Sequence, residues 1–476
     1  MTGVRVHQLA GQTAIYSLAS LAPIAAGFAI TPSITRLLGP EEYGIAATCL
    51  VVVQVFGLLA TLGLPASITR HALIERSGVS GAARLVLLAA ACSATVVMVA
   101  ALTSRLWSPT TTGFDWRPAI VWATVAGGSL SVVTAYQALA RAQGRAWRFV
   151  LVATLISILG QGSGLVMLTV STRADYYVAG LTITYAALAG VLVLDTMRLA
   201  RSGPLSADSW RRDASGALRV GLPTIPHGLA MLLATGLAVV LASTRMGSHQ
   251  AGQLQLILML GGAPALALTA INNAWAPSVY AIPGGSRGAA IAHTAPFVLI
   301  FVSFTSVCVA LAAPFVLSLL APPSVLAGAP VWAVALAAGS SLPAVVYLSN
   351  VHLLFAEGRS GALAWMTPTS LVLAALLAIM ASTRWGLGAL ASLPLLFYTA
   401  QAALVSLVRR RVTTDTWSER SLLVHLVPPA LLLSVIAGLP STGWADATRL
   451  TASITLVAGG GLWSLWWFGG RRKVTA

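Results

Sequence analysis

The sequence predicts an all-α polytopic membrane protein with about fourteen transmembrane helices. Of its 476 residues, 57% are hydrophobic and only 8% are charged, whereas soluble domains carry roughly 25% charged residues. Apolar stretches of about twenty residues, the length that crosses the hydrocarbon core, recur along the whole chain. Two short motifs also recur about two hundred residues apart, which predicts two lobes related by a parallel repeat.

The predicted spans are joined by short loops, none of them long enough for a folded soluble domain. Their limits are 9–34, 44–66, 83–103, 117–139, 149–171, 177–197, 220–243, 251–276, 291–312, 326–349, 363–382, 386–408, 421–438 and 450–468. The predicted domains are 1–197 for the N-lobe, 198–219 for a cytoplasmic linker, 220–408 for the C-lobe, and 409–476 for a C-terminal helix pair with a basic tail.

The net charge of +16 is explained by orientation in the bilayer. With a cytoplasmic N-terminus, the predicted inner segments carry about three times as many arginine and lysine residues as the outer ones. Both termini are therefore expected to be cytoplasmic. Nucleic acid is not expected as a partner, because no basic patch is interleaved with aromatic residues.

The first repeated motif is Thr35–Gly44, of sequence TRLLGPEEYG, which lies between the first two predicted spans. Its Gly39-Pro40 predicts a tight turn, and two glutamates then suit the N-terminus of the next helix. A fainter copy follows span seven as Thr244–Gly252. A second pair, Ala142–Arg145 and Ala356–Arg359, shares an Ala-(Gln/Glu)-Gly-Arg core. Both pairs preserve orientation, as parallel repeats require.

Prolines are expected to bend the first helix of each lobe. Pro23 and Pro32 lie in span one, and Pro223 and Pro226 lie at the start of span seven. A proline frees a backbone carbonyl, which a membrane tolerates where that carbonyl faces protein or a wet cavity. The bends either border a transport pathway or are ordinary packing kinks.

Three stretches near the N-terminus resemble the polysaccharide-biosynthesis flippases. They are Gly11–Tyr16, Thr35–Gly44 and Leu62–Arg70, and Arg219–Pro223 is similar to the entry to the second lobe of these proteins. These flippases are the Wzx-like members of the multidrug/oligosaccharidyl-lipid/polysaccharide exporter (MOP) superfamily, which also contains the MATE drug exporters. The resemblance extends to the span number and the two-lobe layout.

This resemblance implies a V-shaped, alternating-access carrier in the bacterial cytoplasmic (inner) membrane. Relatives move polyprenyl-diphosphate-linked oligosaccharides from the cytoplasmic to the outer leaflet, and their last two spans are thought to help hold the lipid tail. The implied partners are this lipid-linked oligosaccharide, the bilayer and other membrane proteins of polysaccharide assembly. No cofactor or metal is expected, and coupling to protons or sodium stays open.

Arginines at span ends are the candidate ligands of a diphosphate, because the guanidinium group is a forked donor of fixed charge. Arg70, Arg145 and Arg359 are expected to receive the diphosphate inside, and Arg36, with its repeat partner Arg245, to release it outside. The alternative is that these side chains extend to the interface and anchor the ends of the helices.

Polar residues inside spans are the candidate cavity lining, because such groups avoid lipid. Gln54 and Gln137 in the N-lobe and His227, Asn272 and Asn273 in the C-lobe are the selected positions. The alternative is hydrogen bonding between helices, which also applies to Gln161, Gln253, Gln255 and Asn350. His227 is either a neutral packed histidine or a proton-sensing one.

Carboxylates are scarce, and none is expected at mid-membrane. Asp195 is expected to pair with Arg198, one helical turn away. A MATE-like drug or cation exporter would be expected to use a mid-membrane acid, so this function is the alternative. A membrane-embedded glycan polymerase or glycosyltransferase is a less favoured alternative, because such proteins commonly need acids in sizeable outer loops. The predicted outer loops of this chain are short. The sequence also has no GxxxxGK[ST] phosphate loop of an ATP-driven pump.

Overall fold

The computed structural model describes residues 6–75, 77–201, 207–439, 446–449, 451–453 and 455. Every regular element in these residues is a helix. The chain divides into two compact units. Unit 1 is Met1–Gln255 with Leu320–Ala327 and Gly361–Ala375, and unit 2 is Leu256–Leu319 with Gly328–Ser360 and Leu376–Ala476. The prediction of an all-α polytopic fold is confirmed.

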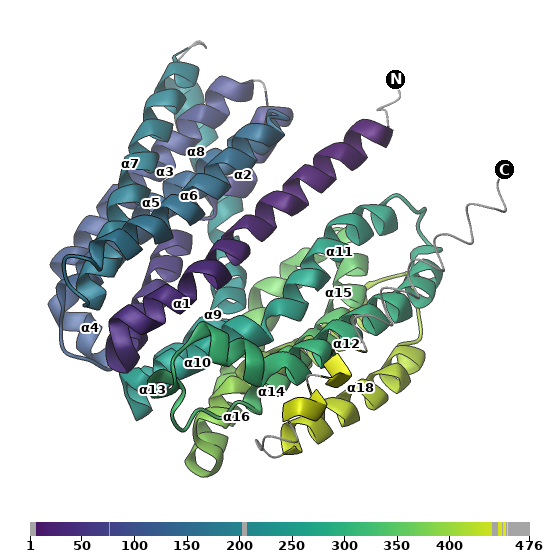
Figure 1. The fold of residues 1–476 in the computed structure, drawn as a ribbon. Coiled ribbons are helices and arrows are strands. Elements are labelled where there is room, and N and C mark those ends of the chain that lie inside the picture. Colours follow the sequence, from purple (N-terminus) through teal and green to yellow (C-terminus); the bar gives the residue numbers. More distant parts are fainter. Residues whose placement is uncertain are drawn as a thin grey trace. The chain divides into compact units, whose positions relative to one another are not determined.

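Unit 1 is a bundle in which α5 packs against α1, α3 and α7, and α6 packs against α1 and α7 (Figure 1). Its apolar core includes Leu64, Ile68, Leu85 and Leu139, all of which are fully buried or nearly so. Its helices are α1 (Val6–Leu59), α2 (Leu64–Leu73), α3 (Gly78–Leu102), α4 (Ser104–Thr112), α5 (Pro118–Ala142), α6 (Ala146–Met167), α7 (Ala174–Ala200), α8 (Ala207–Gly221), η1 (Leu222–Thr224), α9 (Ile225–Met246) and α13 (Pro323–Leu326).

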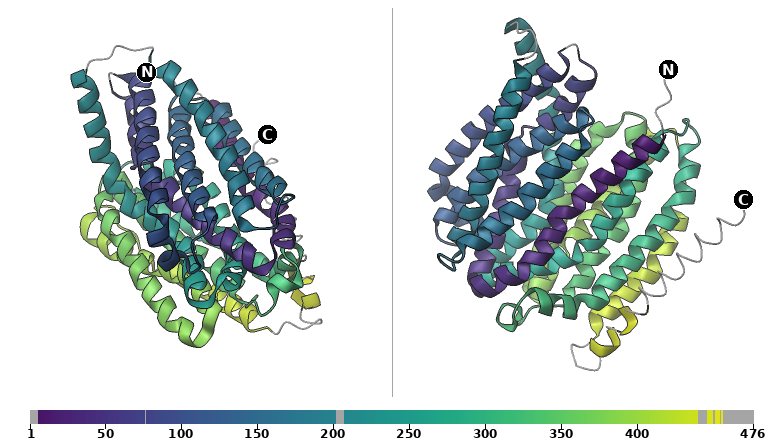
Figure 2. Two further views of the ribbon diagram at one scale, coloured as in Figure 1. Left: turned by 90° about the vertical axis from the view of Figure 1, so that its left-hand side faces the viewer. Right: turned by 45° about the horizontal axis from the view of Figure 1, so that its top comes forward.

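Unit 2 is built on the packing of α15 against α17 and α11, and of α14 against α18. Figure 2 shows its green and yellow helices from two further sides. Four elements have residues in both units: α10 (Ser248–Gly261), α12 (Arg287–Leu320), η2 (Ser360–Ala362) and α16 (Leu363–Ala391). The others are α11 (Ala263–Tyr280), α14 (Ala333–Gly339), α15 (Ser341–Ala356), α17 (Leu393–Val412) and α18 (Arg420–Gly438).

Within the described residues, ten helical segments are long and apolar enough to cross a membrane. The first, Ala25–Leu59, covers parts of two predicted spans. The predicted spans 386–408 and 421–438 fall on α17 and α18, which are outside these ten. The last predicted span, 450–468, lies almost wholly outside the described residues. The chain is therefore a multi-pass membrane protein, while the total of fourteen spans and the orientation stay predictions.

The predicted turn at Gly39 is a break within α1. Gly39 has φ 72° and ψ −177°, a combination that essentially only glycine adopts. Its repeat counterpart Gly247 ends α9 with φ 110° and ψ 169°. The two copies of the motif therefore change direction with similar backbone geometry. Pro32 lies in helix on the near side of the break, so glycine rather than proline interrupts this segment.

The second glycines of the two motif copies, Gly44 and Gly252, lie against each other in unit 1. A Cβ atom added to Gly44 would lie 1.6 Å from the carbonyl oxygen of Ser248, and one added to Gly252 would lie 3.2 Å from the Gly44 Cα. No side chain fits between the two backbones. The contact between equivalent residues is the arrangement expected at the axis of a parallel repeat.

The second repeated pair also has matching geometry. In one loop, Arg145 N–H donates to Ala140 O at 2.9 Å, and in the other Arg359 N–H donates to Leu354 O at 2.8 Å. In both, the preceding glycine has positive φ, 67° at Gly144 and 69° at Gly358. These hydrogen bonds form a Schellman helix end, so the shared sequence core encodes the same helix termination twice.

The α-helix is interrupted near Pro223, at the start of the predicted C-lobe. The helix α8 ends at Gly221, the 3-10 turn η1 contains Pro223, and α9 begins at Ile225. Gly221 lies against the backbone of Gly63, where an added Cβ would come 2.1 Å from Gly221 O. The two Gly-Leu-Pro segments of the chain therefore pack against each other in unit 1.

An ion network joins three helix starts in unit 1. The guanidinium of Arg117 donates to Glu42 at 2.8 Å and 3.1 Å and to Asp175 at 2.8 Å. Glu42 also accepts the Ala174 N–H that begins α7, and Asp175 accepts the Ala119 N–H in the first turn of α5. Carboxylates stabilise helix N-termini, so Glu42 stabilises the start of α7 and Asp175 the start of α5.

Replacing Arg117 by alanine is expected to destabilise the protein by about 3 kcal/mol, because two largely buried carboxylates would lose their shared cation. The readout is thermal unfolding in detergent. The matched control is Arg173→Ala, which removes the more exposed of the two arginines at Asp175 and should cost below about 1 kcal/mol. Equal losses in the two variants would contradict the assignment.

Replacing Gly44 by alanine should abolish or strongly reduce folded protein, because the new methyl group overlaps backbone rather than a movable side chain. Gly190, a helical glycine of α7 with open space around its Cβ position, provides the control. Fluorescence-detected size-exclusion chromatography would measure the folded fraction. Normal folding of Gly44→Ala would show that the two motif copies do not pack as described.

Candidate functional site

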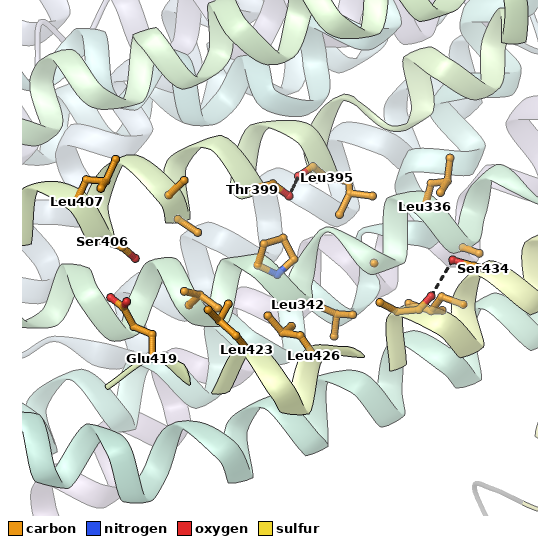
Figure 3. A pocket seen from close by; sticks show the side chains of 18 of the residues that line it. Leu336, Leu342, Leu395, Thr399, Ser406, Leu407, Glu419, Leu423, Leu426 and Ser434 are labelled. Carbon is orange, nitrogen blue, oxygen red and sulfur yellow. Dashed lines mark hydrogen bonds between the residues drawn. The ribbon is translucent and has the colours of Figure 1, made fainter. Parts of the chain in front are cut away.

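One cavity of unit 2 has a volume of about 610 Å³ and lies between α14, α15, α17 and α18. Its walls are almost entirely apolar, formed by side chains such as Leu342, Leu395 and Leu426. Figure 3 shows Glu419 at one end and Ser434 and Leu336 at the other. A long apolar wall with charge at one end can accommodate a ligand that has a hydrocarbon chain and an anionic head.

The charged end of this cavity is an ion cluster at the junction of α17 and α18. Glu419 is 4% exposed and pairs with Arg410 and, at 3.0 Å, with Arg409. Burial alone would raise the pKa of Glu419, but the hydrogen bonds from Arg410 and Arg409 outweigh it and lower the pKa. Glu419 is therefore held ionised. Two positive arginines surround one negative glutamate, so the cluster has a net positive charge. The exposed Arg410 can therefore attract an anion.

The segment between α17 and α18 contains a second buried acid, Asp415, which is 1% exposed. Arg287 is its ion-pair partner at 3.8 Å, and neither of its carboxylate oxygens has a hydrogen bond in the described residues. The N–H groups of Thr414 and Asp415 donate to Glu357. Desolvation raises the pKa of Glu357, but these backbone hydrogen bonds and that of the Thr414 hydroxyl lower it more.

A polar contact beside the cavity fixes α15 to α17 and to the loop after it. Asn350 is fully buried, donates to the Ser406 hydroxyl at 3.0 Å and accepts from the Trp417 indole at 3.3 Å. Ser406 also lines the cavity. This contact positions the cavity wall, and Asn350 therefore serves helix packing.

The five predicted arginines all lie at helix ends with exposed side chains. Arg36 donates to Pro32 O at 2.8 Å, just before the Gly39 break. Arg70 pairs with Glu75 at 3.3 Å. Arg145 and Arg359 follow the Schellman glycines, and Arg245 lies in the last turn of α9. Their exposure is compatible with ligand binding and with interfacial anchoring, and their role stays a prediction.

The predicted polar span residues fall into two groups. His227 bonds to the Thr367 hydroxyl through Nδ1 at 2.7 Å, and the Asn272 Oδ1 is buried without a hydrogen-bond partner in the described part of the chain. Gln54 and Asn273 are exposed and Gln137 is half-buried, so these three are open to ligand or lipid. Their assignment to a cavity also stays a prediction.

Gln253 is buried and donates to the carbonyls of Val325 and Ala327 at 3.0 Å and 2.7 Å. It therefore fixes α10 to the segment around α13. Gln253 and Asn350 thus make hydrogen bonds between helices, which is the alternative to lining a cavity.

The predicted pairing of Asp195 with Arg198 is wrong. Asp195 Oδ2 accepts from the Tyr136 hydroxyl at 2.8 Å and pairs with Arg148 at 3.4 Å. Sequence proximity favoured Arg198, but the packing of α5, α6 and α7 brings a tyrosine and an arginine from neighbouring helices. The cluster at Arg409, Asp415 and Glu419 was also missed, although three successive arginines followed by two acids were its visible signal.

Comparison with known proteins matches residues 9–281 to the polysaccharide biosynthesis protein family. The fold is similar to that of lipid II flippase MurJ in an inward closed conformation, with a TM-score of 0.62, 10% identity and coverage of 96% of this chain and 99% of that one. It is also similar to an inward-facing multidrug resistance MATE family transporter of the MOP superfamily, with a TM-score of 0.61, 17% identity and coverage of 83% and 94%.

A third similar structure is the MATE multidrug transporter DinF-BH, with a TM-score of 0.61, 13% identity and coverage of 86% and 96%. No curated protein sequence matches the chain. These low identities show a shared fold, while the family match spans more than half of the sequence. The chain belongs to the polysaccharide biosynthesis protein family and has the fold of MOP-superfamily transporters.

Proposed function

We propose that this protein is a flippase that moves a polyprenyl-diphosphate-linked oligosaccharide from the cytoplasmic to the outer leaflet for cell-surface polysaccharide export. It is a transporter and not an enzyme, works by alternating access, and resides in the bacterial cytoplasmic membrane. The family match and the likeness to a lipid II flippase support this class of cargo.

The single observation that carries the proposal is the apolar cavity of unit 2. A ligand that fits it has a greasy chain with an anionic end, and a polyprenyl diphosphate has both. The tail would lie along the leucine-rich walls, where burial contributes about 0.8 kcal/mol per methylene group. Arg410 would face the diphosphate at the charged end, and Glu419 would hold that arginine in place.

The exposed arginines at helix ends would handle the diphosphate as it crosses between faces. Arg70, Arg145 and Arg359 receive it inside and Arg36 and Arg245 release it outside, while the polar span residues contact the glycan. Forked, permanently charged donors suit this role because the diphosphate stays ionised throughout. If protons or sodium ions drive the cycle, their movement would be coupled to the alternating-access movement of the carrier.

The proposal is tested by deleting the gene and measuring surface polysaccharide and the leaflet distribution of its lipid-linked precursor. Loss of the polysaccharide with precursor accumulating in the inner leaflet is expected. Export of a cationic dye by the reconstituted protein, with no glycan defect on deletion, would instead favour a MATE-like drug or cation exporter.

Filling the cavity should stop transport without unfolding the protein. Ala430 is an exposed residue of α18 that lines the cavity, so Ala430→Trp should occupy tail space and reduce complementation at least tenfold. The control is Leu431→Trp, at the adjacent position, which is 62% exposed and does not line the cavity. Immunoblots would establish equal protein levels. Full complementation by Ala430→Trp would show that the cavity does not hold the tail of the cargo.

Replacing Arg70 by alanine should reduce polysaccharide export about tenfold or more, because a charge-assisted hydrogen bond is worth roughly 1.5–3 kcal/mol. The ion pair with Glu75 is exposed, so little stability should be lost. Arg105→Ala, another exposed arginine in unit 1, serves as the control. Full activity at normal protein level would remove Arg70 from the candidate ligands.

A further inference from the structure

A second cavity, of about 400 Å³, lies in unit 1 between α5, α6 and α7. It is at the end where α5 and α7 finish and α6 begins, since its lining includes Tyr136, Arg148 and Arg198. The cavity belongs to none of the sites described above. Its lining combines a charged centre with an apolar flank.

The charged centre is organised around Asp195. This carboxylate accepts from the Tyr136 hydroxyl at 2.8 Å and pairs with Arg148 at 3.4 Å. The pairing holds the Arg148 guanidinium at the cavity, yet leaves 48% of that side chain exposed. Arg198 lines the same cavity. Two arginines against one aspartate leave a net positive charge, so the cavity is complementary to an anion.

The apolar flank opens outward. Leu151, Val191 and Leu194 line the cavity and are nevertheless exposed, with 62% of Val191 and 61% of Leu194 accessible. All three lie on membrane-spanning helices, where an exposed aliphatic side chain faces acyl chains. The cavity therefore continues into the lipid phase, and its occupant has both an anionic and an acyl part.

The surroundings place this cavity at the membrane–water interface. Trp147, in the first turn of α6, is 71% exposed, and tryptophan is the characteristic residue of that interface. Arg201 directly follows α7 and adds positive charge at the same helix ends. Basic pockets between transmembrane helices at this depth bind anionic lipid headgroups.

We propose that this cavity binds an anionic phospholipid, with the phosphate at Arg148 and Arg198 and an acyl chain along Leu151, Val191 and Leu194. Asp195 and Tyr136 are positioning residues that hold Arg148 toward the phosphate. The bound lipid joins the ends of α5, α6 and α7 and so stabilises unit 1. This site is independent of the cargo proposed above, and its test measures binding rather than transport.

The test adds lipid to the full-length protein in neutral detergent and follows thermal unfolding. Phosphatidylglycerol should raise the midpoint by about 3 °C or more, since a ligand of the folded state stabilises it. Phosphatidylcholine with the same acyl chains should give little change. Inorganic phosphate alone should also give little change, because it lacks the acyl part.

The decisive variant is Arg148→Ala/Arg198→Ala, which should lose the phosphatidylglycerol response. Arg105→Ala/Arg384→Ala removes two exposed arginines elsewhere and should keep it. Where the first variant fails to fold, Arg148→Lys/Arg198→Lys retains the charges and should keep a reduced response. An unchanged response in Arg148→Ala/Arg198→Ala, or an equal rise with phosphatidylcholine or phosphate in the native protein, would overturn the proposal.

Discussion

The close approach of Gly44 and Gly252 is the constraint on which the arrangement of unit 1 depends. Two helices meet there with no side chain between their backbones, and a single added carbon would overlap a carbonyl group. In each of the two segments, the backbone turns sharply five residues before the contact glycine. Gly39 and Gly247 provide these turns with backbone angles that other residues avoid. Four glycines thus act together: two allow the sharp turns, and the other two allow the close packing of segments that are distant in the sequence.

Much of this could be predicted from sequence because it depends on local chemistry. Apolar length predicts the membrane helices, and Gly39-Pro40 predicts the break within α1. Pairings between helices could not be predicted in this way. Asp195 has a nearby arginine in sequence, but Arg148 and Tyr136 reach it through the packing of three helices. The partners of Glu42 likewise come from residues far along the chain.

The candidate sites show the same division. The leucines of the unit 2 cavity look like ordinary span residues, and only packing reveals that they enclose a space. The arginines at positions 409 and 410 look like an interfacial anchor. The structure instead buries the first against Glu419 and leaves the second at the mouth of the cavity. Two neighbouring arginines therefore have different environments, and the sequence alone does not show which of them is buried.

The contact between equivalent glycines also bears on how such a chain could have arisen. A half-length ancestor carrying one motif copy would have paired with itself, and its glycine would have met its own twin on the dyad. Any mutation there would have been present on both sides of the junction at once. In the present chain the two glycines are encoded separately, so each motif copy can change on its own, and position 42 is glutamate where the corresponding position 250 is glutamine.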